Sequence, residues 1–342
     1  MDGGLRTTAI GSLPLTDPAE AARRVFDLGL DVPFWPELPK LGWREGMIPQ
    51  AVDGFPCVRF DEGKKSVWFD TSPDAKAEEL TAFYEKALAE DPAHFAMPEA
   101  SSAGLYAFLA ECERRGERYP VLKGHITGPL TVGLGAKNSE GVAVFYDPEM
   151  VDVLCRGLAL RALWQVRELE KHADEVIVFY DEPVLAGFGT SAYLSLTAEA
   201  VIETLGEAIA PLKAEAAVGI HCCGNTDWAM MTRTGADVVS FDSHGYQRSL
   251  ALYPDAVREF LEAGGNIAWG AVPTLEHVGE ETADQLTARL REGFALLVAK
   301  GIPEDLIRRK ALLTPGCGAG SLTEEELRWV FDSLEAVRDS VR

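Results

Sequence analysis

Short apolar runs recur along the chain, and most of them are unbroken stretches rich in β-branched residues. Runs of this kind are typical of strands that are buried on both faces of a parallel sheet. We therefore predict strands at residues 7–12, 31–35, 121–126, 176–180, 218–221, 238–241, 267–270 and 312–315.

Amphipathic segments separate these runs, and two of them begin with an explicit helix-start signal. Thr282 with Gln285, and Thr323 with Glu326, match the pattern of a capping box, and apolar residues at helical spacing follow each pair. Gly264 and Gly265 are placed to end the helix that precedes residue 267. The pattern thus predicts helices that alternate with the strands.

Alternation of this kind predicts a parallel sheet with right-handed crossovers, and eight strands favour closure into a barrel. We expect an α/β fold, a (β/α)8 TIM barrel that occupies residues 1–342 as a single domain. An irregular insertion at approximately 37–98 is predicted to hold a hairpin (58–61 and 66–70) and a helix near 76–89. It would cover one end of the barrel, either as a lid or as a stabilising extension.

Composition and charge narrow the classes of partner. Apolar residues make up 47% and charged residues 25%, which is ordinary for a globular protein, and the formal net charge is −22. Such acidity argues against binding nucleic acid or an anionic membrane; it fits solvated helix faces or a docking surface for a basic protein. The N-terminus lacks a signal segment and no apolar run approaches the roughly 20 residues of a membrane span, so we expect a cytoplasmic protein.

Cysteine and histidine residues gather where predicted strands end. The six cysteines are too few for a disulfide framework in a chain of this length. His221 and Cys223 flank one position at the end of a strand, so both side chains should share a face while Cys222 points away. Cys317 follows another strand between two glycines, which we expect to free the backbone so that its side chain turns inward.

These three residue types are the usual ligands of zinc, and strand ends in a barrel meet at one mouth. Asp242 is the natural candidate for a fourth ligand, and His244 is a second candidate. An exchangeable fourth position would make the zinc catalytic. The alternative is a set of isolated core cysteines with a surface histidine.

Two further strand ends carry polar groups. Asp181 and Glu182 follow one strand, and because adjacent residues point in opposite directions they are a poor acid/base pair but a plausible grip for a cationic amine. Ile10, Gly11 and Ser12 offer backbone N–H groups and a hydroxyl to a carboxylate. Together the two ends predict recognition of an amino-acid zwitterion.

In their order along the chain, residues 7–12 (TTAIGS), Asp181-Glu182-Pro183, His221-x-Cys223 and Pro315-Gly316-Cys317-Gly318 resemble the C-terminal barrel of cobalamin-independent methionine synthase. Corrinoid-dependent methyltransferases and uroporphyrinogen decarboxylase-like barrels are the wider relatives. The resemblance implies zinc on His221, Cys223 and Cys317, with Asp242 where the family has Glu.

The resemblance also implies the substrate. Homocysteine would place its carboxylate on Ile10, Gly11 and Ser12 and its amine on Asp181, with a further acidic contact at Glu37. The implied reaction transfers a methyl group to the thiol and yields methionine.

Two departures from the family bear on the methyl donor. The chain lacks the second barrel that helps full-size synthases hold folate, and residues 268–273 carry no histidine where the family has one near the folate. A folate amine leaves readily only when it is protonated, whereas a corrin cobalt needs no proton. We therefore expect a methylcorrinoid, free or on a corrinoid protein, in preference to 5-methyltetrahydrofolate. Alternatives are methyl transfer to another thiol such as coenzyme M, a uroporphyrinogen decarboxylase-like enzyme, and a non-catalytic binding barrel with structural zinc.

Overall fold

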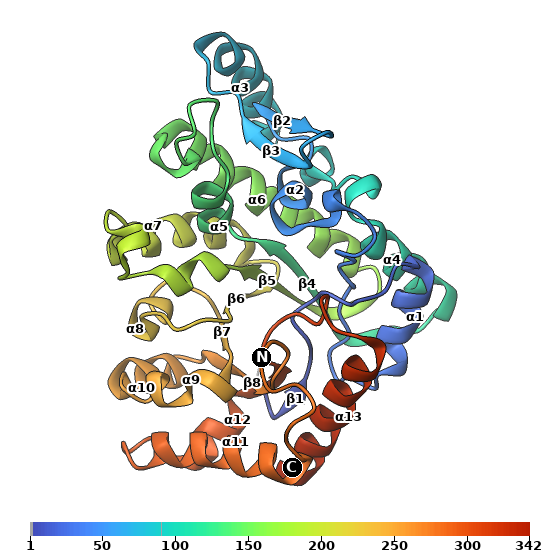
Figure 1. Ribbon diagram of the computed structural model, residues 1–342, viewed down its shortest axis with the longest axis vertical. Helices are drawn as coiled ribbons and strands as arrows, with labels where there is room; N and C mark the ends of the chain where they lie inside the picture. Colours follow the sequence, from blue (N-terminus) through green and yellow to red (C-terminus); the bar gives the residue numbers. More distant parts are fainter. Residues whose placement is uncertain (1–2, 90) are drawn as a thin grey trace.

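The computed structural model describes residues 3–89 and 91–342, and its centre is a parallel sheet that forms a half-barrel (Figure 1). This sheet has seven strands in the order β1-β9-β8-β7-β6-β5-β4, all paired in parallel. The strands are β1 (Arg6–Thr7), β4 (Tyr119–Thr127), β5 (Ala173–Asp181), β6 (Ala217–Cys222), β7 (Val238–Phe241), β8 (Asn266–Val272) and β9 (Ala311–Pro315).

The predicted eight-stranded barrel is confirmed only in part. Six predicted strands appear as β4 to β9, but the first is reduced to β1 with an isolated bridge at Ser12, and residues 31–35 form no regular strand. The backbone of that segment still contacts both edges of the sheet: Val32 N donates to Thr7 O at 3.0 Å, and Lys123 N donates to Pro33 O at 2.8 Å. Pro33 and Pro36 lack an N–H group, which prevents a continuous ladder there.

Side chains on the concave face of the sheet change from apolar to polar along the strands. Near the start of the strands a separate small hydrophobic cluster forms, made of Val32, Val121, Ile177, Phe179, Val238, Ala268 and Leu312. Strand side chains alternate with period two, so the same face continues to Lys123 and His125 on β4 and to Asp181 on β5. All three are buried. Polar groups therefore concentrate at the C-terminal ends of the strands.

Helices follow the strands and cover the convex face of the sheet (Figure 1). Both predicted capping boxes are confirmed, at the starts of α11 and α13, and Gly264 adopts the positive φ expected after α10. The helices are α1 (Pro18–Asp27), α2 (Met47–Val52), α3 (Pro73–Leu88), α4 (Ala103–Arg115), α5 (Pro129–Gly135), α6 (Pro148–Leu169), α7 (Ala198–Ile209), α8 (Trp228–Met231), α9 (Ser243–Leu250), α10 (Pro254–Glu262), α11 (Ala283–Val298), α12 (Glu304–Arg309) and α13 (Glu324–Val341).

The region predicted as an insertion forms one end of the molecule (Figure 1). Its hairpin is confirmed as β2 (Val58–Asp61) and β3 (Ser66–Phe69), and its helix as α3. Lys76 on α3 forms ion pairs with Asp147, at 2.6 Å, and with Glu149 at the start of α6. Tyr84 Oη donates to Asp152 at 2.7 Å. These contacts fix α3 against α6.

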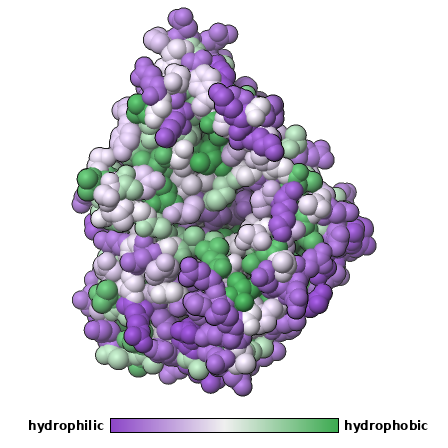
Figure 2. Space-filling model, viewed as in Figure 1, coloured by the Kyte–Doolittle hydropathy of each residue, from purple (hydrophilic) through white to green (hydrophobic). Residues whose placement is uncertain are grey.

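One face of the molecule is hollowed near its centre, and Figure 2 shows hydrophilic side chains inside the hollow and hydrophobic ones on parts of its rim. Across the described part of the chain, the helices are all too short or too polar to traverse a bilayer.

Candidate metal centre

His221 is held in one orientation at the end of β6. Its side chain is buried, and Nδ1 lies 2.9 Å from Oγ of Ser240 on the adjacent strand β7. Nε2 is buried as well and has no hydrogen-bond partner among the described residues. A buried nitrogen without a partner is costly, so this geometry leaves Nε2 available to a metal ion.

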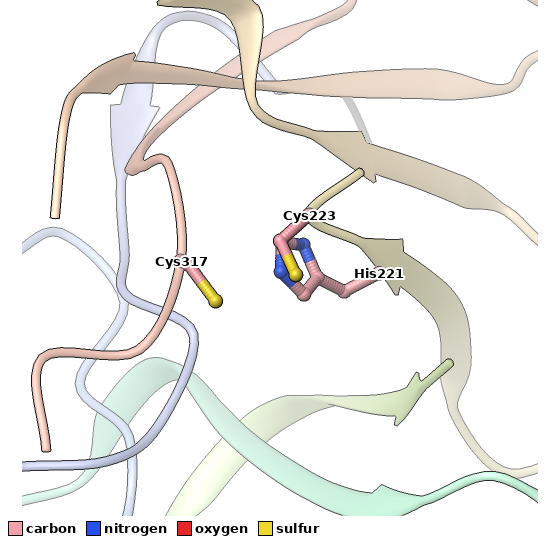
Figure 3. A group of neighbouring side chains, drawn as sticks. All are labelled: His221, Cys223 and Cys317. Atoms are coloured by element: carbon pink, nitrogen blue, oxygen red, sulfur yellow. The ribbon is translucent and has the colours of Figure 1, made fainter. Parts of the chain in front are cut away.

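Two cysteines complete a group of potential metal ligands. Cys223 follows β6 and Cys317 follows β9, and ligand atoms of His221, Cys223 and Cys317 all lie within 4.8 Å of one another. Figure 3 shows the Sγ atom of Cys317 pointing toward Cys223 and the ring of His221. With zinc–sulfur bonds of roughly 2.3 Å, two sulfurs of a tetrahedral site lie about 3.8 Å apart, so the group fits a zinc ion. Cys222 lies in the hydrophobic core outside the group.

The two thiols share their protons unequally. The neighbouring thiol of Cys317 and then the ring of His221 lower the pKa of Cys223 to about 4, although burial opposes the change. The proximity of Cys223, together with burial, raises the pKa of Cys317. One thiolate is thus already favoured in the protein alone, and a bound cation would favour the second.

The glycines around Cys317 make room for its loop. A Cβ at Gly316 would lie 2.9 Å from Oδ1 of Asp242, and one at Gly318 would overlap Oγ of Ser12. Neither glycine has a positive φ. The expectation that they free the backbone is therefore corrected: they are small because the loop passes tightly between Ser12 and Asp242.

A cavity of about 150 Å³ lies on one side of the metal-ligand group. It brings together the metal-ligand group and most of the predicted substrate-binding residues, and it adds Glu45, which the sequence did not indicate. Its lining consists of Ile10, Ser12, Glu37, Pro39, Glu45, Met47, Asp181, Pro183, His221, Cys223, Cys317 and Gly318. We call it the small cavity.

The carboxyl groups of the small cavity differ in their partners. Oδ1 of Asp181 is buried with no hydrogen-bond partner among the described residues, and burial raises the pKa of Asp181 to about 6. Burial and the nearby Asp181 raise the pKa of Glu37 to about 8. Glu45 accepts a hydrogen bond from Ala103 N at 3.0 Å and one from Gln50. Among the described residues, no hydrogen-bond donor reaches the side chain of Glu37 or Oδ1 of Asp181.

Glu182 has a structural role. Its carboxylate accepts hydrogen bonds from Leu130 N at 2.9 Å, Thr131 N at 2.6 Å and Thr131 Oγ1 at 2.5 Å at the start of α5. Alternation along β5 turns it away from Asp181, as the sequence predicts.

A larger cavity of about 470 Å³ lies beside Cys223 and Cys317 as well, and we call it the outer cavity. Asp242 and His244 line it. Asp242 caps α9, where its Oδ1 accepts from His244 N at 3.0 Å, and it is not part of the metal-ligand group. His244 Nε2 lies 2.8 Å from Oε2 of Glu281, which also pairs with Arg289.

Gly11 of the predicted carboxylate site lies against His125. A Cβ at Gly11 would lie 2.5 Å from Nε2 of that histidine. The sequence did not single out His125 or Lys123. Their signal was present, because both are polar residues at alternate positions of an otherwise apolar run.

Comparison with known proteins places the fold. No family model and no curated protein matches the chain. Among solved structures, it is similar to a B12-independent methionine synthase from Shewanella sp. W3-18-1 in complex with selenomethionine (18% identity, 99% of this chain and 98% of that chain, TM-score 0.60). The chain is also similar to a methyltransferase from Methanosarcina mazei, with 17% identity over 98% of this chain and 92% of that chain and a TM-score of 0.55.

A putative vitamin-B12-independent methionine synthase from Listeria monocytogenes is also similar (14% identity, 98% of both chains, TM-score 0.55). The structural neighbours are thus methionine synthase-type proteins and a methyltransferase, as the sequence motifs predicted. At these identities the likeness establishes a shared α/β fold over almost the whole chain.

Proposed function

We propose that this protein is a zinc-dependent methyltransferase that methylates the thiol of homocysteine and releases methionine. One observation carries the proposal: two thiols and a histidine nitrogen that has no hydrogen-bond partner among the described residues lie between an acidic small cavity and a larger outer cavity. The fold that the chain shares with methionine synthase-type proteins supports it.

His221, Cys223 and Cys317 are the proposed zinc ligands, and Asp242 is the proposed fourth. Because Oδ1 of Asp242 already caps α9, its hold on the ion would be weak and an incoming thiol could replace it. A bound zinc ion would supply one thing, a lowered pKa for the substrate thiol, which is near 8.5 in water.

The small cavity would orient the amino acid. Asp181 and Glu37 would accept hydrogen bonds from the ammonium group, and Ser12 with the backbone of Ile10 and Gly11 would hold the carboxylate. The thiol would then point toward the cysteines and the outer cavity. In the reaction the sulfur–carbon bond forms as the bond from the methyl group to the donor breaks, and that electron pair leaves with the donor.

Charge distinguishes this substrate from the alternatives. Three carboxylates line the small cavity, and its described lining contains no Arg or Lys. Coenzyme M carries a sulfonate and no amine, and uroporphyrinogen carries many carboxylates, so neither offers the α-ammonium group that the acidic side chains of this cavity can bind. An α-ammonium group matches it. A purely structural zinc site would not account for the acidic small cavity beside the metal-ligand group.

Two donors fit different observations. The absence of histidine on β8 favours a methylcorrinoid, free or on a corrinoid protein, because its cobalt leaves without a proton. His244, however, brings a histidine to the outer cavity from the α9 start, which suits a donor that needs an acid, such as 5-methyltetrahydrofolate. We propose the methylcorrinoid.

The test is methionine formation by purified, zinc-loaded protein with homocysteine and either donor. Turnover with methylcobalamin is expected. Turnover with methyl-folate alone would reverse the donor proposal, and turnover with neither donor would contradict the methyltransferase proposal.

A further inference from the structure

Two fully buried basic residues of β4 lie beneath the small cavity. The ammonium group of Lys123 donates to Ile10 O at 2.6 Å and lies 3.4 Å from Nδ1 of His125, with the ring of Phe179 beside it at 4.6 Å. No carboxylate of the described residues lies within ion-pair distance of Lys123. Burial lowers the pKa of Lys123 to about 8, so at neutral pH the group still carries its proton.

Lys123 fixes the tautomer of His125. An ammonium group has only donors, so Nδ1 must accept, and in the neutral ring the proton is then on Nε2. The ring is neutral, because burial and the charge of Lys123 hold the pKa of His125 well below its usual range. His125 therefore presents an N–H donor at Nε2.

The ring of His125 cannot turn that donor elsewhere. It stacks on Trp35, with ring centroids 4.1 Å apart and planes 15° apart. Gln165 accepts from Trp35 Nε1 at 2.9 Å and donates to the backbone oxygen of His125 at 3.0 Å. Gly11 closes the remaining side. The imidazole is therefore restrained by Trp35 on one face and by Gly11 beside its Nε2 end.

The donor faces one of the carboxylates of the small cavity. Oε1 of Glu37 lies 3.7 Å from Nε2, which is beyond hydrogen-bond distance, and within the described part of the chain the buried Nε2 has no hydrogen-bond partner. A shift of Glu37 by under one ångström would complete the bond. When a substrate binds with its α-ammonium group beside Glu37, that positive charge would favour the ionised form of the Glu37 side chain. The ionised carboxylate is the better hydrogen-bond acceptor for His125.

We propose that His125 is a positioning residue that determines specificity: its Nε2–H group holds Glu37 at the amine end of the small cavity, so that the site selects a thiol with an α-ammonium group over the same thiol without one. This inference rests on the proposed function. A thiol without the amine would leave the buried carboxylate of Glu37 without its ammonium partner, and sites built on such bonds reject the analogue that lacks the group.

The test compares homocysteine with 4-mercaptobutyrate, which has the same thiol and carboxylate but no amine. We would measure kcat and KM for both thiols with His125→Leu, which lacks the donor, and His125→Gln, whose amide nitrogen can replace Nε2. The expected result for His125→Leu is a loss of roughly 10- to 100-fold in the kcat/KM ratio of the two thiols, from KM for homocysteine, with zinc content retained. His125→Gln should restore most of the ratio.

Calorimetric titration of the zinc-loaded proteins with both thiols gives the same comparison without turnover. Glu37→Gln serves as a second variant should His125→Leu fold poorly, and it should lower the ratio similarly. Equal losses of kcat/KM for both thiols, or an unchanged kcat/KM ratio in His125→Leu and Glu37→Gln, would overturn the role of His125. The proposed function would be unaffected by that result. A wild-type protein that neither binds nor methylates either thiol would overturn the proposed function and this inference with it.

Discussion

Oγ of Ser240 lies 2.9 Å from Nδ1 of His221, so the neighbouring strand fixes the ring whose other nitrogen joins the metal-ligand group. The two residues are register partners on β6 and β7. Pairing of the two strands thus sets the direction in which the side chain of a proposed zinc ligand points.

This relationship predicts a loss of metal affinity in Ser240→Ala. Partners behind a ligating histidine typically contribute about 10- to 100-fold to metal affinity, and we expect a loss in that range with the fold intact. Competition with a chromophoric chelator measures it. Ser243→Ala is the matched control, because its buried hydroxyl donates to Gly270 O instead. Equal affinities in the two variants would remove Ser240 from this role.

Cys317→Ala should abolish stoichiometric zinc binding and methyl transfer, because it removes one of the three proposed zinc ligands of the group. Cys222→Ala is its control, since Cys222 is a fully buried thiol next to Cys223 and outside the group. It should keep zinc and lose only about 1–2 kcal/mol of stability from core packing. Zinc analysis and urea unfolding of both variants test this, and full zinc occupancy in Cys317→Ala would exclude it as a ligand.

Gly11→Ala should strain the protein against His125. The added methyl would lie 2.5 Å from Nε2, and overpacking of this kind costs about 1–3 kcal/mol. The double variant Gly11→Ala/His125→Ala should be less destabilised than the sum of the single variants, because removal of the ring makes room. Urea unfolding of the four proteins measures the coupling. If the losses of unfolding free energy in the two single variants simply add up in the double variant, the methyl group at position 11 does not clash with the ring of His125.

Buried carboxyls should make the metal-free protein less stable as the pH rises. Burial raises the pKa of Glu37 to about 8 and of Asp181 to about 6, so between about pH 4 and 8 these two carboxyls bind more protons in the folded protein than in the unfolded chain. Each of these two carboxyls should therefore lower the free energy of unfolding over that interval, by up to about 1.4 kcal/mol per pH unit, and the lowered pKa values of Cys223 and His125 act in the opposite direction. Glu37→Gln should flatten the slope between pH 5 and 8. A slope identical to that of the wild type would contradict the assigned state of Glu37.

Local patterns were sufficient to predict much of the fold and the metal-ligand group. Strands β4 to β9 are unbroken apolar runs, and His221, Cys223 and Cys317 follow such runs directly. Because parallel strands end at one edge, their proximity could be inferred without knowing any packing. The hairpin and both capping boxes depend on neighbours in sequence and were predicted for the same reason.

Features that depend on distant contacts were not predicted. Residues 31–35 are a separate case, because Pro33 and Pro36 are visible in the sequence and already indicate that a regular strand is interrupted there. Glu45 lies in an irregular region, and only the packing of that region over the sheet brings it to the small cavity. Asp242 was expected as a ligand, yet it is also a preferred residue for capping α9, and the structure shows that second role.

X-ray absorption at the zinc edge, with and without homocysteine, tests the central claim most directly. The proposed site predicts two sulfur ligands at roughly 2.3 Å and one imidazole nitrogen in the loaded protein, and a third sulfur when homocysteine is added. A first shell without two sulfurs, or a shell that homocysteine leaves unchanged, would contradict the account.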